Sequence, residues 1–184
     1  KALGILYKCT EDKKWEELRN EAQKSFIHYF WDEKRGYLSD CLHCNEFAPA
    51  AQADADDALR SNQVFAVTLG AVEDEAIEVA IIESSSCLII PGAIRSLANR
   101  PVERELPVYA DGGQLLNDPK NPYHPHYEGD EDTRRKPAYH NGTAWGWPFP
   151  SYAEALLKVY GDDAKDTVLS LLNSSRVLYD TGCI

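Results

Sequence analysis

The spacing of apolar residues predicts that this chain is built from amphipathic helices. Near its start, apolar side chains recur at the three- and four-residue intervals of one helix face, at Trp15, Leu18, Ala22, Phe26 and Tyr29. Thr10 is the expected N-cap of this helix, with Glu11 and Asp12 in the first turn. The helix should run to about Trp31, and residues 3–7 predict the last turns of an earlier helix.

Residues 61–90 carry the longest helical signal in the chain. This signal should break near residues 73–75, where acidic side chains suit the start of a second helix, and it should end at Pro91-Gly92. Earlier in the chain, a glycine among polar residues in segment 32–38 predicts a turn with a short hairpin. An acidic loop, residues 54–57, follows.

Residues 93–150 hold most of the prolines and many of the aromatic residues, and they show little periodicity. Long loops of this kind usually carry function, so residues 91–150 form the predicted substrate region. Two helices should follow, one capped by Ser151 and ending at Gly161, the other capped by Asp162. Because no strand series with period two is visible, we predict an all-α fold whose core is built by helix packing alone.

Composition narrows the class of protein further. The 184 residues suit one domain, and both ends read as cuts within it, so residues 1–184 are expected to be part of a larger domain. Thirty acidic and 19 basic side chains give a net charge of −11, which disfavours nucleic acid as a partner. No signal peptide and no apolar run of roughly 20 residues occurs, so we expect a cytoplasmic protein away from membranes. The scattered, odd-numbered cysteines predict reduced thiols: Cys9, Cys41, Cys44, Cys87 and Cys183.

The densest set of candidate binding groups lies in residues 138–150, which combine two indoles with an imidazole and an amide. A pyranose presents an apolar C–H face and a rim of hydroxyls, so flat aromatic rings beside fixed hydrogen-bonding groups suit it. An aromatic loop that packs on the core is the alternative, and composition alone does not separate the two.

Two arginines mark further candidate sites. Arg60 stands at a helix start, where it can fork to a carboxylate while Asn62 and Gln63 face a ligand. Simple helix capping is the alternative there. Arg95 follows the turn at Pro91-Gly92 and is the weaker candidate, because arginines on protein surfaces are common.

Other chemistries lack the residues that they need. The segment 41–44, Cys-Leu-His-Cys, has no second Cys/His pair at the spacing of a structural zinc site. The acidic stretches 54–57 and 128–132 lack the twelve-residue calcium loop and are interpreted as solvated charge. The sequence contains no GxSxG, Gly-rich phosphate-loop or HExxH motif, so we expect neither a metal nor a cofactor.

Together these motifs resemble the C-terminal amylo-α-1,6-glucosidase domain of glycogen debranching enzymes, over about residues 37–180. Residues 60–63 match a family helix start, Arg-x-Asn-Gln, although Ser61 stands where the family often has proline. Residues 91–97 match a Pro-Gly turn followed by Arg and Leu. Residues 139–147 match a Tyr-His-x-Gly-x-x-Trp-x-Trp loop, which a Tyr-x-Gly at residues 127–129 precedes.

The resemblance implies a fold and a reaction. The family fold is a toroid of six inner and outer helix pairs, (α/α)6, of which this chain would form an incomplete part. The reaction is an inverting hydrolysis that needs one protonated and one ionised carboxyl group, about 6.5–9.5 Å apart. In relatives the acid precedes the first helix and the base follows a segment like residues 181–184. Both are therefore expected outside this sequence, and no catalytic carboxylate is assigned within it.

The resemblance also implies a shell of substrate-holding residues: Asp57, Arg60, Asn62, Gln63, Arg95, Tyr127, Tyr139, His140, Asn141, Gly142, Trp145 and Trp147. Asp57 is expected to orient Arg60. His140 should donate to a sugar hydroxyl, the two tryptophans should stack on the sugar or form a wall of its pocket, and Gly142 should let the backbone approach closely.

The implied function is the release of glucose from α-1,6-linked branch stubs of glycogen or another branched α-glucan. Two alternatives stay open. One is another toroidal α-glucosidase, of the glucoamylase or trehalase type, and the other is a non-catalytic carbohydrate-binding fragment. The residues predict no particular oligomeric state.

Overall fold

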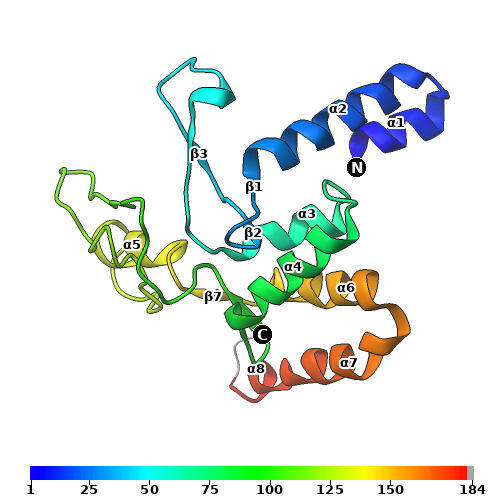
Figure 1. The fold of residues 1–184 in the computed structure, drawn as a ribbon. Helices are drawn as coiled ribbons and strands as arrows, with labels where there is room; N and C mark the ends of the chain where they lie inside the picture. Colours follow the sequence, from blue (N-terminus) through cyan, green and yellow to red (C-terminus); the bar gives the residue numbers. More distant parts are fainter. Residues whose placement is uncertain (182–184) are drawn as a thin grey trace.

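Helices dominate the computed structural model, which describes residues 1–181 (Figure 1). The chain opens with two helices that lie side by side, α1 (Ala2–Thr10) and α2 (Lys13–Phe30), and α1 is the earlier helix that the sequence predicted. Asp12 caps α2, because its side chain accepts a hydrogen bond from a first-turn amide at 3.1 Å. The prediction that Thr10 caps α2 is wrong, because Thr10 ends α1 and its hydroxyl donates to a carbonyl of that helix.

Short strands follow the first two helices. β1 (Trp31–Asp32) and β2 (Tyr37–Leu38) form the predicted hairpin, in which Gly36 has a φ of 71°. β3 (Leu42–His43) pairs with β4 (Asp54–Ala55), and a single 3-10 turn, η1 (Ala50–Gln52), lies between them. These pairs bring the acidic loop back towards the chain that follows β2.

The long helical signal in the middle of the chain divides as predicted. A 3-10 turn, η2 (Ser61–Gln63), leads directly into α3 (Val64–Thr68). The next helix, α4 (Glu75–Ser85), starts at the predicted break, where Asp74 is its N-cap. Another 3-10 turn, η3 (Ser86–Leu88), ends the stretch slightly earlier than predicted.

Residues expected at the end of that helix instead enter a small antiparallel sheet. The Pro-Gly turn joins β5 (Ile89–Ile90) to β6 (Ala93–Arg95), and β7 (Ala144–Trp145) pairs with the other side of β6. Ile94 of β6 is 1% exposed and belongs to the core, so the prediction of a core built by helix packing alone is wrong. Strands of two or three residues are too short to leave a period-two signal in the sequence.

Between β6 and β7 the chain forms an irregular lobe beside the helices (Figure 1). Its ordered elements are a π-helical turn, η4 (Glu131–Arg135), and the short helix α5 (Lys136–Tyr139). The C-terminal part is helical, with α6 (Phe149–Tyr160), the 3-10 turn η5 (Gly161–Ala164), α7 (Lys165–Ser174) and α8 (Arg176–Asp180).

Two of the three predicted boundaries in this C-terminal part are wrong. Ser151 lies inside α6, because the helix already begins at Phe149. Gly161 does end α6, with a φ of 59° that suits glycine. Asp162 lies within the 3-10 turn, and α7 begins at Lys165 without a side-chain cap.

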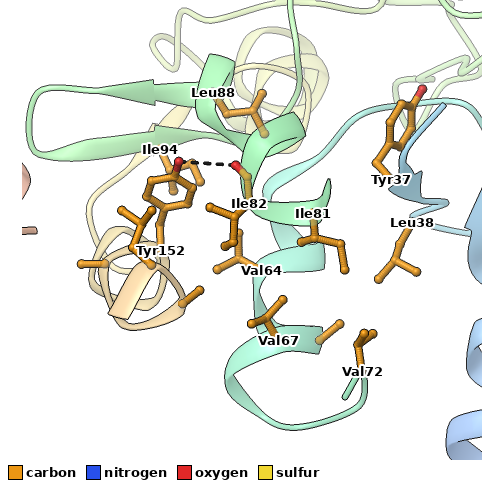
Figure 2. Close-up of a cluster of buried hydrophobic side chains, with 14 of the residues drawn as sticks. Tyr37, Leu38, Val64, Val67, Val72, Ile81, Ile82, Leu88, Ile94 and Tyr152 are labelled. Atoms are coloured by element: carbon orange, nitrogen blue, oxygen red, sulfur yellow. Dashed lines mark hydrogen bonds between the residues drawn. The ribbon is translucent and has the colours of Figure 1, made fainter. Parts of the chain in front are cut away.

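The main core lies where α3, α4 and α6 pack together (Figure 2). The largest contributions come from side chains that are almost fully buried, among them Val67, Ile81, Leu88, Ile94 and Tyr152. The Tyr152 hydroxyl donates to the Ile82 carbonyl across the α4–α6 contact at 3.4 Å, and burial raises the pKa of this phenol to about 12. Burying each large apolar side chain contributes roughly 1.5–3 kcal/mol, so this contact fixes the scaffold on which the loops stand.

Candidate functional site

A cleft of about 510 Å³ opens between segments that are far apart in the sequence. The segment after β2, the 3-10 turn η2, the residue that follows β6 and the residues around β7 form its walls. Its lining consists of Asp40, Arg60, Ser61, Asn62, Ser96, Tyr139, His140, Trp145, Trp147 and Pro148. The predicted site residues that meet here are Arg60, Asn62, Tyr139, His140, Trp145 and Trp147.

Arg60 braces this cleft from within. Its Nη2 donates to Asn141 Oδ1 at 2.9 Å, and its Nη1 donates to the His140 carbonyl. Its Nε lies 3.5 Å from Asp40 Oδ2. Burial lowers the pKa of the guanidinium, while the neighbouring Asp40 carboxylate opposes that shift. Because an arginine stays protonated in proteins, Arg60 holds two walls of the cleft together as a fixed cation.

Asp57 does not orient Arg60, contrary to the prediction. Its carboxylate accepts hydrogen bonds from the backbone amides of Glu103 at 2.8 Å and Arg104 at 3.0 Å. Burial raises the pKa of Asp57, but these amide bonds outweigh burial and hold the pKa below its ordinary value. Asp40 takes the predicted place beside Arg60, and a contact between such separate positions leaves no local pattern in the sequence.

Asn62 and Gln63, although adjacent, have different environments. Asn62 lines the cleft, and its Nδ2 donates to Asp40 Oδ1 at 3.0 Å. Gln63 is buried: its Oε1 accepts from the Leu38 amide at 3.0 Å, and its Nε2 donates to Ser85 Oγ at 3.0 Å. The Gln63 amide therefore fastens the start of α3 to the core, and Asn62 is the one that faces the cleft.

Aromatic side chains form much of the cleft wall. Tyr139 and Trp145 have ring centroids 5.0 Å apart, and Tyr127 makes a T-shaped contact with each of them. Trp147 stacks almost parallel on Phe65, with centroids 5.8 Å apart and 12° between the ring planes. Trp147 is also 69% exposed, so it offers a flat apolar surface to a ligand. Tyr127 supports this wall without lining the cleft.

Three of the four residues between α5 and β7 are predicted site residues, and they have different environments. His140 is exposed in the cleft, with its ring edge-on to Tyr139. Asn141 is buried, and its Nδ2 donates to a carbonyl of α5 at 3.0 Å. Gly142 has a φ of 133°, and a Cβ at this position would meet Tyr123 Cε2 at 2.8 Å. The glycine is therefore required by the packing of the protein itself, which the sequence analysis did not foresee.

Arg95 lies on β6 opposite Ala144 of β7 and does not line the cleft. Its neighbour Ser96 does, and Ser96 Oγ accepts from the Gly142 amide at 2.9 Å. The Ser96 amide in turn donates to the Thr143 carbonyl at 3.0 Å. The motif after the Pro-Gly turn therefore positions the aromatic loop, rather than presenting its arginine to the cleft.

The acidic loop is a structural element. Asp56 and Asp57 are only 3% and 9% exposed, so the interpretation of this loop as solvated charge is wrong for both. His43 Nε2 lies 3.2 Å from Asp56 Oδ2. Within residues 1–181, no group of three or more His, Cys, Asp or Glu side chains is arranged to hold a metal ion. The thiols described are free and exposed, at Cys9, Cys41, Cys44 and Cys87, and Cys183 lies outside the described residues.

Exposed aromatic faces beside amide, imidazole and carboxylate groups are typical of a site for a polar, uncharged ligand such as a sugar. The chain belongs to the amylo-alpha-1,6-glucosidase family, whose model matches residues 3–181, so the predicted family is confirmed. This family is one of glycosidases of the glycogen debranching type. No curated protein and no solved structure matches the chain. None of the helices in the described part of the chain has the length and apolar character to cross a membrane.

Proposed function

We propose that this chain forms the substrate-holding part of a debranching glycosidase that releases glucose from α-1,6-linked branch stubs of glycogen or a related glucan. The observation that carries the proposal is the meeting of the family motifs at one cleft. Arg60 of the first motif bonds to the carbonyl of His140 in the last, although 80 residues separate them. The tryptophans of that last motif line the same cleft.

The cleft supplies both kinds of contact that a glucose residue needs. The exposed indole of Trp147 suits the C–H face of the ring, while His140 and Asn62 suit its hydroxyl groups. Stacking that removes about 60 Å² of apolar surface from water contributes about 1.5 kcal/mol. The remaining affinity then comes from hydrogen bonds between fixed side chains and hydroxyls, which also select the orientation of the sugar.

Hydrolysis with inversion requires an acid and a base about 6.5–9.5 Å apart with a water molecule between them. Asp40 is the only acidic residue among those that line the cleft in the described chain. We therefore assign the catalytic acid and base to segments beyond the two ends of this chain. The helices of this chain would form part of a larger (α/α)6 toroid, with the cleft at the end where the loops gather.

The decisive experiment measures glucose release from a branched limit dextrin by the full-length gene product, beside the isolated 184-residue chain. We expect release by the full-length protein alone. Faster turnover of maltose or trehalose would indicate a different α-glucosidase, and sugar binding without turnover by the full-length protein would indicate a carbohydrate-binding role. Release by the short chain would contradict the placement of acid and base outside it.

A further inference from the structure

Asp40 stands at the junction of two hollows in the surface. It lines the aromatic cleft and also a smaller, mostly apolar pocket of about 280 Å³ next to it. The preceding residue, Ser39, is buried, and its amide donates to the Phe30 carbonyl at 2.8 Å. The backbone at this position is therefore fixed, while the Asp40 side chain keeps 25% of its surface exposed.

The carboxylate of Asp40 is held from one side and open on the other. Its Oδ1 accepts from Asn62 Nδ2 at 3.0 Å, and its Oδ2 lies 3.5 Å from Arg60 Nε. An ionised carboxylate has about four acceptor positions. Among the described residues, these two contacts are its only polar interactions with other side chains. About half of its capacity to accept hydrogen bonds therefore remains available in the cleft.

Arg60 is in the opposite situation. Its side chain is only 12% exposed, and its two terminal nitrogens already donate to the His140 carbonyl and to Asn141 Oδ1. Its remaining contact is with Asp40. Arg60 is thus committed to protein groups, whereas the carboxylate that it holds faces the ligand space.

We infer that Asp40 is a substrate-binding residue that accepts hydrogen bonds from hydroxyl groups of the bound glucose, and that Arg60 and Asn62 are the residues that position it. This inference rests on the proposed function. A carboxylate is acceptor-only and every free sugar hydroxyl carries a donor hydrogen, so the two are complementary. Bonds to an ionised acceptor are stronger than neutral ones, which makes Asp40 a main source of selectivity for hydroxyl position.

The test pairs changes in the protein with changes in the sugar. Calorimetric titration of the full-length protein would use methyl α-D-glucopyranoside and the four forms that each lack one hydroxyl. In the wild type, loss of the hydroxyl that bonds Asp40 should weaken binding about tenfold to a hundredfold. In Asp40→Ala the complete sugar should already bind that weakly, and the penalty for the same missing hydroxyl should disappear.

Two further variants make the result specific. Asp40→Asn keeps the shape of the side chain, so it replaces Asp40→Ala if the alanine variant does not fold. Asp54→Asn is the matched control, because Asp54 also pairs with an arginine, at 3.3 Å, but lies outside the cleft. Its penalties for missing hydroxyls should equal those of the wild type.

The outcomes separate this inference from the proposed function. If the wild type binds the sugar and the penalty pattern is unchanged in both Asp40 variants, Asp40 is only a structural partner of Arg60 and the inference is wrong. If the wild type binds none of the sugars, the proposed function itself fails. A penalty that disappears only in the Asp40 variants supports both.

Discussion

Replacing Gly142 by alanine tests how tightly the aromatic loop packs against the segment that contains Tyr123 and His124. The backbone there has a φ of 133°, a conformation that residues with a Cβ rarely adopt. An added Cβ would lie 2.8 Å from Cε2 and 2.9 Å from Cδ2 of the Tyr123 ring, and 3.2 Å from the His124 carbonyl carbon. The His124 atom belongs to the backbone, which pairs with Gly142 in a parallel bridge, so a rotation of the tyrosine ring alone does not relieve the contact.

The expected loss of stability has two sources. A strained backbone conformation costs about 1–3 kcal/mol, and overpacking adds about 1–3 kcal/mol. The sum, about 2–6 kcal/mol, is a large part of the roughly 5–15 kcal/mol that stabilises an ordinary domain. Because the Gly142 amide also donates to Ser96 Oγ in the cleft wall, sugar binding should fall together with stability.

Urea denaturation followed by far-ultraviolet circular dichroism measures this loss. Gly146→Ala is the control in the same loop, because a Cβ there would meet nothing closer than 3.7 Å. It should change the unfolding free energy by less than about 1 kcal/mol. Adding Tyr123→Ala to Gly142→Ala should recover the part of the overpacking that comes from the tyrosine ring, and leave the backbone strain and the contact with the His124 backbone. A Gly142→Ala protein as stable as the control would refute the reasoning.

Three further predictions concern the cleft and its supports. Trp147→Ala should leave the unfolding free energy within about 1 kcal/mol, because the indole is 69% exposed, yet weaken sugar binding measured by calorimetry by about 1.5 kcal/mol. Arg60→Lys keeps the charge but loses the hydrogen bonds to His140 and Asn141. The midpoint of thermal denaturation and the sugar affinity measured by titration should therefore both be lower. An unchanged affinity would contradict the bracing role of Arg60. The pKa of Asp57 is lowered in the folded protein, so its stabilisation is complete above about pH 4 and is lost as the pH falls through the folded value. Asp57→Asn should therefore cost about 1–3 kcal/mol at pH 7, and this cost should shrink as the pH falls through the folded value, measured by denaturation at each pH.

The sequence predicts most of the helices here because each long helix repeats its apolar spacing over several turns. The N-cap of α2 is predicted wrongly because two nearby residues suit that position equally well. Thr10 and Asp12 are both good N-caps, and only the reversal of the chain after α1 decides between them. The strands around Ile94 are missed because each has only two or three residues, and because β7, which pairs with β6, lies far along the chain.

The candidate site divides in the same way. The aromatic loop containing Trp145 and Trp147 could be identified because its unusual composition is local. The partners of single polar residues could not, since they come from other parts of the chain. The sequence cannot distinguish the side chain of Gln63 from an amide that binds a ligand. In the structure its oxygen accepts from the amide of Leu38 and its nitrogen donates to the hydroxyl of a serine in α4. Asp40 belongs to none of the recognised motifs, and only its contact with Arg60 in the folded chain identifies it as a candidate.

The hydrogen bonds of Arg60 also make the formation of the cleft depend on the stability of the whole fold. The bonds to His140 and Asn141 close loops of 80 and 81 residues, and the folded core must offset the loss of chain entropy that closing such loops entails. A substitution in the α3–α6 core that costs about 1.4 kcal/mol raises the unfolded fraction tenfold without touching any cleft residue. If the folded state is already only marginally stable, that change leaves most molecules unfolded and therefore unable to bind. Random variants of this chain that lose sugar binding should therefore include many in the core, and measuring the folded fraction of each separates them from variants of the cleft itself.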